Sequence, residues 1–345
     1  MPLIAIIILN YNGRHLLDDC LNSLARLTTP VEVVVADNGS TDGSVEHLHA
    51  QWPNARVLVF ERNLGFAGAY NRALAEVECE WAVLLNNDAV LAPNWLEILL
   101  DAARQHPRAA ILGGKLLFSG ERMPGRVIQC AGASYTDAGT AFEIGWGQAD
   151  HGQYDQPRVV ASIPGAALLI KRAVFLELGG FDADYFAYLE DVDLCWRAWL
   201  AGHEVWYIPQ AEAQHHFGAS GGGRASPFRI RQMQSNRYAN MLKHFEPGTL
   251  FSGLLTSIVY DAYRVLEFSA RGHWDGLRAL ALGTLDFWRR LPGLFARRQT
   301  IQNQRRVRDR DLRALGLLVP ALTALQEYQR LARLALSQHA EPRRE

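Results

Sequence analysis

Three carboxylates, those of Glu190, Asp191 and Asp193, fall within four positions where a helix is expected to begin. Acidic residues at a helix N-terminus commonly stabilise the helix dipole and need no catalytic role. Crowding of like charges, however, raises the pKa of one carboxyl group, which makes it a candidate general base. We therefore treat Asp191 as the candidate catalytic residue, and Glu190, Asp193 and Arg197 as residues that contact the acceptor or support those that do.

A second polar group, Asn86-Asn87-Asp88, ends the apolar run at residues 81–85. Oxygen ligands at a strand end suit a hard divalent cation, Mg²⁺ or Mn²⁺, that is shared with phosphate oxygens. Such an ion would offset the charge that develops on a departing diphosphate. A polar strand end without a metal also explains the triplet when it is taken alone.

Two further groups of polar residues follow apolar runs near the N-terminus. Leu9-Asn10-Tyr11-Asn12 ends the first run, and Asp37 ends the second. Ligands of open α/β sheets bind outside the carboxyl ends of the strands, so these side chains could contact a base and a ribose. An ordinary turn explains the tetrapeptide equally well, but a carboxylate against an apolar run needs a partner.

The segment at residues 63–71 contains Asn63, Gly65 and Gly68. This spacing is not the GxGxxG fingerprint, so it does not predict a nicotinamide cofactor. Small residues at a helix start permit close approach of a ligand, or merely tight packing of the helix on the sheet.

Strands and helices alternate through the first part of the chain. Continuous apolar runs predict buried parallel strands at residues 3–9, 31–36, 56–60 and 81–85. Helical periodicity is found between and after them, at about residues 16–25, 44–50, 67–77 and 94–105. This order predicts an α/β fold with a Rossmann-like, mostly parallel sheet and helices on both faces.

The pattern changes after residue 109. Short strands at residues 111–118 and 159–163 predict a mixed sheet, followed by a helix over 191–201 and a strand over 203–208. Beyond residue 247 the pattern is helical, with no further strand expected. We predict a catalytic domain at 1–247, with halves at about 1–108 and 109–247, and a helical appendage at 248–345.

Bulk properties exclude several classes of protein. The 345 residues carry a net charge of −1, which gives no general attraction to nucleic acid. The four cysteines lie far apart without a CxxC pair, so neither a zinc finger nor a disulfide framework is indicated. The N-terminus lacks the features of a signal peptide, and no apolar run is long enough to span a bilayer. We expect a cytoplasmic location.

Taken in order, several motifs resemble the bacterial family 2 glycosyltransferases of the GT-A fold, particularly their rhamnosyltransferase-like branch. The resemblance covers about residues 3–245. Its motifs are ILNYN, VADNGSTDGS, NLGFAGAYN, LLNNDA, PGAALLIKR, GGFDADYFAYLEDVDLCWR and HHFGAS.

The resemblance implies a role for each matched residue. Asp191 matches the catalytic base, Asp88 the metal ligand of a DxD-type motif, and His215 a histidine that completes the metal site. His216 is the alternative to His215, and residues 218–224 resemble a loop that orders over the donor. The donor-binding positions are Leu9, Asn10, Tyr11, Asn12, Asp37, Asn63, Gly65, Asn86, Asn87 and Asp88.

The implied activity is inverting transfer of a sugar from a nucleotide diphosphate donor, of dTDP-rhamnose or UDP-hexose type. The acceptor would be a hydroxyl of a glycan or lipid-linked acceptor in cell-surface polysaccharide synthesis, and the cofactor Mn²⁺ or Mg²⁺. A nucleotidyltransferase and a non-catalytic nucleotide-sugar-binding module are the alternatives. A nucleotidyltransferase would need a phosphate-binding loop rich in glycine and basic residues after the first strand, and Asn10-Tyr11-Asn12-Gly13 is not such a loop.

The segment after residue 250 interleaves arginines with aromatic residues. Such helices can lie against anionic lipid headgroups, which would place the protein at the inner face of the cytoplasmic membrane. A helical subdomain whose arginines are solvated or paired, and a homodimer interface, are the alternatives. The arginines are Arg264, Arg271, Arg278, Arg289, Arg290, Arg297, Arg298, Arg305, Arg306, Arg308 and Arg310.

Overall fold

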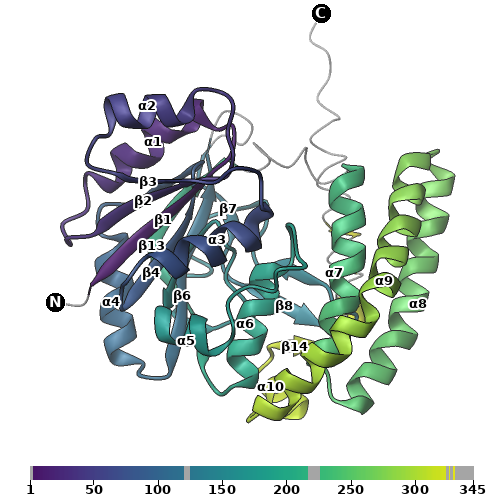
Figure 1. The fold of residues 1–345 in the computed structure, drawn as a ribbon. Coiled ribbons are helices and arrows are strands. Elements are labelled where there is room, and N and C mark those ends of the chain that lie inside the picture. The colour runs from purple at the N-terminus through teal and green to yellow at the C-terminus, as the bar shows by residue number, and fades with distance from the viewer. Residues whose placement is uncertain (1–2, 120–124, 217–225, 324–325, 327–328, 331–345) are drawn as a thin grey trace, which may run out of the picture.

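The computed structural model describes residues 3–119, 125–216, 226–323, 326 and 329–330. The predicted loop at residues 218–224 lies outside the described residues. A large sheet with helices on both faces forms one side of the molecule, and a layer of long helices stands beside it (Figure 1).

Four parallel strands form the N-terminal part of the sheet, in the order β4-β1-β2-β3. Their bounds are β1 (Ile4–Asn10), β2 (Glu32–Asp37), β3 (Arg56–Val59) and β4 (Trp81–Asn86). Alternate residues of β1 enter two different cores: Ala5 and Ile7 pack in one, Ile6 and Ile8 in the other. The predicted burial of this strand on both faces is therefore confirmed.

Helices cover the two faces. One core joins the sheet to α1 (Arg14–Leu24), α2 (Ser44–Gln51) and α4 (Trp95–Gln105). The opposite core contains α3 (Gly65–Glu76), α5 (Arg172–Glu177) and α6 (Glu190–Leu200). All the helices predicted in this part of the chain are found, with ends shifted by a few residues.

The rest of the large sheet is mixed, as predicted. β12 (Ala167–Lys171) lies antiparallel between β4 and β6 (Ala109–Phe118), and β13 (Glu204–His215) runs parallel to β6. β13 extends beyond the predicted end at residue 208 and so carries His215 to the edge where β4 ends. Shorter strands complete the region: β5 (Ala89–Leu91), β7 (Val127–Cys130), β8 (Ala133–Thr136), β9 (Ala141–Glu143), β10 (Gln148–Ala149) and β11 (Arg158–Val159).

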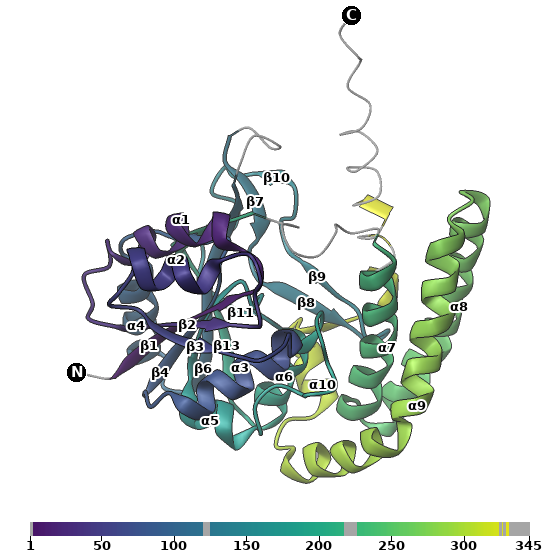
Figure 2. The same cartoon turned by 45° about the horizontal axis from the view of Figure 1, so that its top comes forward.

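Long helices form the C-terminal layer, which Figure 2 shows standing apart from the sheet. They are α7 (Pro227–His244), α8 (Pro247–Ala270) and α9 (Trp274–Gln304), followed by the short α10 (Asp309–Ala314). α7 begins at a Ser226 cap, whose Oγ accepts a hydrogen bond from the Arg229 amide, and it packs along α9. None of the described helices is long and apolar enough to cross a membrane.

One expectation about the C-terminal segment was wrong, and one of the alternatives given for its arginines is seen in part. β14 (Leu318–Val319) pairs with β8, although no strand was predicted beyond residue 247; two residues are too few to show a pattern. Several of the arginines attach the helices to the body of the protein. Arg297 binds Asp182 and Asp184, and Arg298 donates to the Phe245 carbonyl.

Candidate active site

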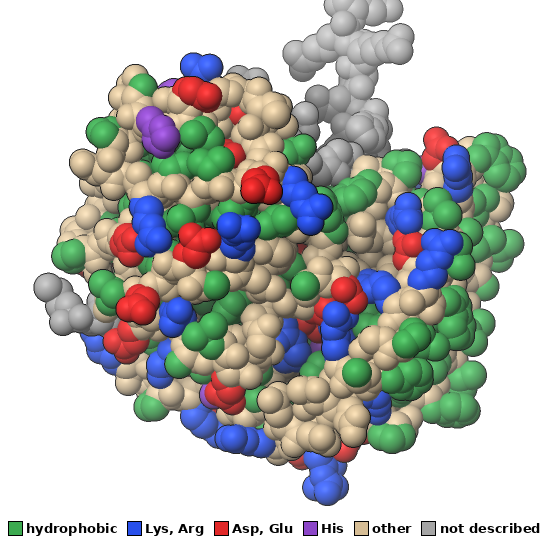
Figure 3. All heavy atoms as spheres, viewed as in Figure 1, with side chains coloured by type: hydrophobic (Ala, Val, Ile, Leu, Met, Phe, Trp, Pro, Cys, Tyr) green, Lys and Arg blue, Asp and Glu red, His purple; other side chains and the backbone are tan. Residues whose placement is uncertain are grey.

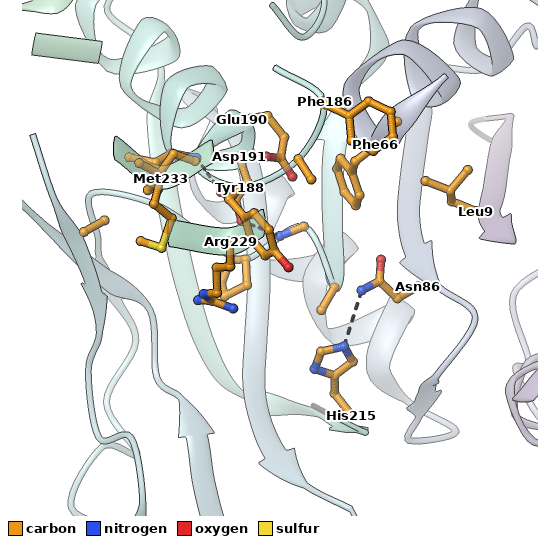
Figure 4. A pocket seen from close by; sticks show the side chains of 18 of the residues that line it. Leu9, Phe66, Asn86, Phe186, Tyr188, Glu190, Asp191, His215, Arg229 and Met233 are labelled. Carbon is orange, nitrogen blue, oxygen red and sulfur yellow. Dashed lines mark hydrogen bonds between the residues drawn. The ribbon is translucent and has the colours of Figure 1, made fainter. Parts of the chain in front are cut away.

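A cavity of about 740 Å³ opens between the strand ends, the β8–β9 hairpin, the loop before α6, and α7 (Figure 4). It brings together most of the side chains that the sequence singled out. The predicted residues that line it are Leu9, Tyr11, Asn12, Asn63, Gly65, Asn86, Asn87, Glu190, Asp191 and His215.

Strand register explains why the donor-side residues meet. Asn10 lies opposite Asp37, and Leu9 lies opposite Asn86, so three strands end at one edge. Asn10 and Asp37 are fully buried behind the cavity wall: Asn10 Nδ2 donates to Asp37 Oδ2 at 3.0 Å, and Asn87 Nδ2 donates to Asn10 Oδ1 at 2.7 Å. These two residues therefore fix the strand ends, while Tyr11 is 45% exposed in the cavity.

Gly65 lies where the wall formed by the strand ends contacts the loop before α6. Its φ is +73°, and a Cβ there would lie 2.4 Å from the Phe186 carbonyl oxygen. Only glycine fits this position. The next amide, that of Phe66, donates to the same oxygen at 2.7 Å. Asn63 Oδ1 accepts the Gly65 amide at 2.8 Å and so holds the turn.

Asp88 and His215 form the candidate metal pair. Asp88 Oδ1 lies 3.1 Å from His215 Nε2, and Asn86 Nδ2 lies 3.3 Å from the same nitrogen. The other ring nitrogen, Nδ1, contacts the Gln129 side-chain amide at about 3 Å, which fixes the ring plane. The described residues contain no group of three or more His, Cys, Asp and Glu side chains placed so that they could hold a metal ion. One carboxylate and one imidazole fit a divalent ion whose remaining ligands are phosphate and water.

Asp191 lies at the first turn of α6 and faces the cavity (Figure 4). Burial raises its pKa, although hydrogen bonds from the amides of Gly165, at 2.9 Å, and Val192, at 2.8 Å, act in the opposite direction. Burial and the neighbouring charge of Asp191 raise the pKa of Glu190 well above its usual range. Glu190 Oε2 has no hydrogen-bond partner among the described residues.

The backbone before this pair is strained. Tyr188 and Leu189 have φ values of +71° and +66°, a backbone conformation that costs residues other than glycine about 1–3 kcal/mol each. Asn236 of α7 stabilises this loop: its Nδ2 donates to the Tyr188 carbonyl at 2.8 Å and to the Ala187 carbonyl at 3.1 Å. Arg290 of α9 donates to Asn236 Oδ1 at 2.8 Å. The C-terminal helices therefore hold the loop that leads to Asp191.

Replacing Asn236 by Ala is expected to lower kcat without weakening donor binding, because the donor-side wall does not contact Asn236. A displacement of the loop by about 1 Å can cost on the order of 100-fold in rate. Steady-state kinetics and donor titration measure the two effects. Asn303→Ala, at an exposed position of α9, is the control. Equal losses in kcat and donor affinity would contradict a positioning role.

Asp193 and Arg197 do not line the cavity, so their contacts fit the second of their two predicted roles, support of the residues at the site, and not direct contact with the acceptor. Asp193 is fully buried and binds Arg197, at 2.7 Å, and Lys243 and His244, at 2.6 and 2.9 Å. Arg197 also donates to the Leu178 carbonyl at 2.8 Å. The helical period turns these side chains inward when Asp191 faces the cavity, so a supporting role behind the site stays the prediction for both residues.

Several site residues were missed because no local pattern marks them. Gln129 lies on a short strand, and Asn236 and Arg290 lie on helices with ordinary polar composition. Gly165, whose amide binds Asp191, does lie in the PGAALLIKR motif, so its segment was noticed but its role was not.

A mixed α/β sheet with polar strand ends, a carboxylate at a helix start and an Asp–His pair beside one cavity fits the GT-A class of glycosyltransferases. The model of the family described as Glycosyl transferase family 2 matches residues 5–178. The chain belongs to this family, as predicted.

Relatives and solved structures agree with this assignment. N-acetylglucosaminyl-diphospho-decaprenol L-rhamnosyltransferase of Mycobacterium tuberculosis is 34% identical over 238 residues, 63% of this chain and 76% of that protein. O-antigen biosynthesis protein RfbC of Myxococcus xanthus is 30% identical over 66% of this chain and 18% of its own length. The predicted likeness to the rhamnosyltransferase branch is confirmed, and neither the nucleotidyltransferase nor the binding-module alternative is favoured.

Two solved structures share the fold. A mannosyltransferase from Pyrobaculum calidifontis, in complex with GDP-Man and Mn²⁺, has a TM-score of 0.52 and 16% identity over 83% of this chain and 87% of that chain. GalNAc-T7 with UDP, GalNAc and Mn²⁺ has a TM-score of 0.55 and 15% identity over 68% of this chain and 47% of that chain. The predicted GT-A fold is confirmed.

Proposed function

We propose that the chain is an inverting, metal-dependent transferase that moves a sugar from a nucleotide diphosphate donor to a hydroxyl of a lipid-linked acceptor. The observation that carries the proposal is the placement of Asp191 in the same cavity as His215 and the donor-side strand ends. The relative in Mycobacterium tuberculosis is named for L-rhamnosyl transfer to a lipid-linked sugar, so a dTDP-linked deoxysugar is the first donor to test, with a UDP-hexose second.

The proposed chemistry is one displacement. The acceptor oxygen attacks the anomeric carbon from the face opposite the diphosphate, and its proton passes to Asp191 Oδ. The bond from the anomeric carbon to the diphosphate oxygen breaks, and the electron pair leaves with the diphosphate. A single displacement inverts the anomeric configuration and needs one base and no covalent nucleophile.

Asp88 and His215 would hold Mn²⁺ or Mg²⁺, with Asn86 beside them. The bound ion would stabilise the charge on the departing diphosphate. Gln129 keeps the His215 ring oriented.

Replacing His215 by Ala is expected to raise the metal concentration for half-maximal activity by about 10- to 100-fold, the range that even supporting residues of metal sites cost. Titration of Mn²⁺ and Mg²⁺ against activity measures the effect. His216→Ala is the matched control, because His216 is its exposed neighbour in the chain. Equal metal dependence of the two variants would remove His215 from the site.

The proposal is tested by binding and hydrolysis of UDP-, dTDP- and GDP-sugars with and without Mn²⁺ or Mg²⁺. We expect metal-dependent binding of one pyrimidine nucleotide sugar. If none of the sugars binds in the presence of metal, the donor assignment is wrong. The anomeric configuration of the product, read by NMR, tests inversion.

We also propose that α8 attaches the protein to the inner face of the cytoplasmic membrane. Its outward face exposes Ile258, Val259 and Leu266 by 62%, 68% and 71%, and hydrophobic side chains gather over α8 and α9 in Figure 3. Asp261, Arg264 and Glu267, the charged residues of α8, are not fully exposed. The exposed residues Trp274, Arg278, Trp288 and Arg289 on α9 supply the aromatic and basic groups that suit anionic headgroups.

Replacing Ile258 by Asp is expected to reduce binding to liposomes that contain anionic lipid, because it places a charge in the apolar face. Co-sedimentation at low salt measures the binding. Val59→Asp, at an exposed apolar position of β3, is the control. Absence of binding by the unaltered protein would overturn the proposal, and a concentration-dependent dimer would assign the face to a second copy instead.

A further inference from the structure

The wall of the cavity farthest from the strand ends is built by α7 and α8 and is not used by the chemistry above. It is lined by Phe228, Arg229, Ile230, Met233, Tyr260 and Arg264. In Figure 4, Arg229 and Met233 lie on one side of Asp191, and Leu9 and Asn86 lie on the other. A donor whose diphosphate lies at Asp88 and His215 leaves this wall for the acceptor.

Arg264 brings positive charge to this wall. Its Nη1 donates to Gln234 Oε1 at 3.2 Å, and its buried Nε has no hydrogen-bond partner. It forms no ion pair within the part of the chain that the structure describes. Arg237, on the same wall, is paired with Asp261 at 2.7 Å. A partly buried guanidinium with a free donor is costly unless a ligand supplies the anion.

Arg229 adds a second guanidinium. It lies over the Tyr188 ring, 4.7 Å from the ring centroid, on the strained loop that leads to Asp191. Guanidinium groups bind phosphate oxygens in a planar, two-pronged geometry. The positive charge of this wall therefore lies beside the loop that carries the general base.

Apolar groups surround the two arginines. Phe228 is 46% exposed and packs against the rings of Phe186 and Tyr188, with centroids about 6 Å apart. Ile230 and Met233 continue this surface along α7. A ligand that contacts both the arginines and the apolar side chains of this wall carries an anionic group next to an apolar chain.

We propose that Arg229 and Arg264 bind the diphosphate of an acceptor in which the sugar is joined through diphosphate to an apolar chain. The chain lies against Phe228 and Ile230, and the sugar hydroxyl reaches Asp191. This inference rests on the proposed function and assigns the acceptor class to a defined part of the cavity.

The test uses two synthetic acceptors with the same sugar and the same undecyl chain, one joined through diphosphate and the other as a neutral glycoside. Equilibrium binding of each is measured for the full chain and for its Arg264→Gln and Arg229→Gln variants. We expect each variant to bind the diphosphate compound at least about tenfold more weakly and the neutral compound unchanged, since only charge-assisted bonds are lost. Arg104→Gln, at an exposed position of α4 away from the cavity, should alter neither.

Two results would overturn the inference. Equal weakening for both compounds would mean that the arginines support the fold of the wall, and unchanged binding of the diphosphate compound would place its anion elsewhere. Binding of nucleotide sugars, measured on the same variants, keeps the two proposals separate. If the unaltered protein binds no nucleotide sugar but binds the diphosphate compound through Arg264, the proposed transfer fails while the anion site stands.

Discussion

Replacing Asp191 by Asn is expected to lower kcat about 10²- to 10⁴-fold, the range that a positioned general base contributes. Donor affinity should stay within about twofold, because the donor is expected to contact the strand ends and not Asp191. Changes at separate, non-contacting sites usually have independent effects. The amide cannot take the acceptor proton, and it can replace only one of the two oxygens that accept the Gly165 and Val192 amides. Single-turnover kinetics with saturating donor measures the chemical step.

Glu190→Gln is the matched control, because Glu190 is the adjacent carboxylate and also lines the cavity. We expect a much smaller loss of kcat for Glu190→Gln, since its burial favours the protonated form, which cannot accept a proton. If Glu190→Gln loses as much as Asp191→Asn, the pair shares the proton. If only Glu190→Gln loses activity, the base has been assigned to the wrong residue.

The pH profile gives an independent check on the base. Burial raises the pKa of Asp191, and the base acts in its deprotonated form. Activity should therefore rise with pH through a pKa above the ordinary aspartate value of about 3.9, and it should be lost as pH falls through that raised value. The residual activity of Asp191→Asn should lack this rise.

The strand ends of the site could be predicted from the sequence for a physical reason. A parallel strand buried on both faces gives a continuous apolar run, and the first polar residue after it marks the edge where ligands bind. Leu9 and Asn86 were found from strand ends in this way. Asp191 was found from the carboxylates at the expected start of a helix. Asn10 and Asp37, predicted in the same way, are buried and hydrogen-bonded to each other behind the cavity wall, and their contact with a donor stays a prediction.

What the sequence did not reveal depends on contacts between distant segments. Asn236 stabilises the loop before Asp191 from α7, and Arg290 supports Asn236 from α9, so neither residue has a local pattern. The arginines expected at a membrane divide into two groups on the same helix: Arg297 binds Asp182 in the body of the protein, whereas Arg278 is exposed. Periodicity alone cannot separate arginines that pair with a carboxylate from arginines that meet solvent. The division of the chain at residue 247 stays a prediction.

Replacing Lys243 by Met is expected to lower the free energy of unfolding by about 3–5 kcal/mol, the cost of breaking a buried ion pair. Lys243 is 1% exposed and lies 2.7 Å from Asp182 Oδ2 and 2.6 Å from Asp193 Oδ1. Burial alone would raise the pKa of Asp193, but the charges of Arg197 and Lys243 hold it well below its usual range. Without the lysine, two buried carboxylates share less positive charge. Urea unfolding at pH 7 measures the difference.

The pH dependence distinguishes this electrostatic cost from a packing defect. Burial lowers the pKa of His244 to about 4, despite its bond to Asp193, so the ring is neutral in the native protein at pH 7. A His pKa below its unfolded value of about 6.5 costs stability as pH falls through that value. In the Lys243→Met variant the ring loses the repulsion of the lysine, so its folded pKa rises and this loss of stability is smaller than in the unaltered protein. The difference in free energy of unfolding between the variant and the unaltered protein should therefore decrease as pH falls from 7 to 5. Lys171→Met, at a partly exposed lysine over the Trp81 ring, should cost about 1 kcal/mol or less at every pH. If the loss in free energy of unfolding of Lys243→Met is the same at every pH, it arises from lost packing around α7 and not from charge.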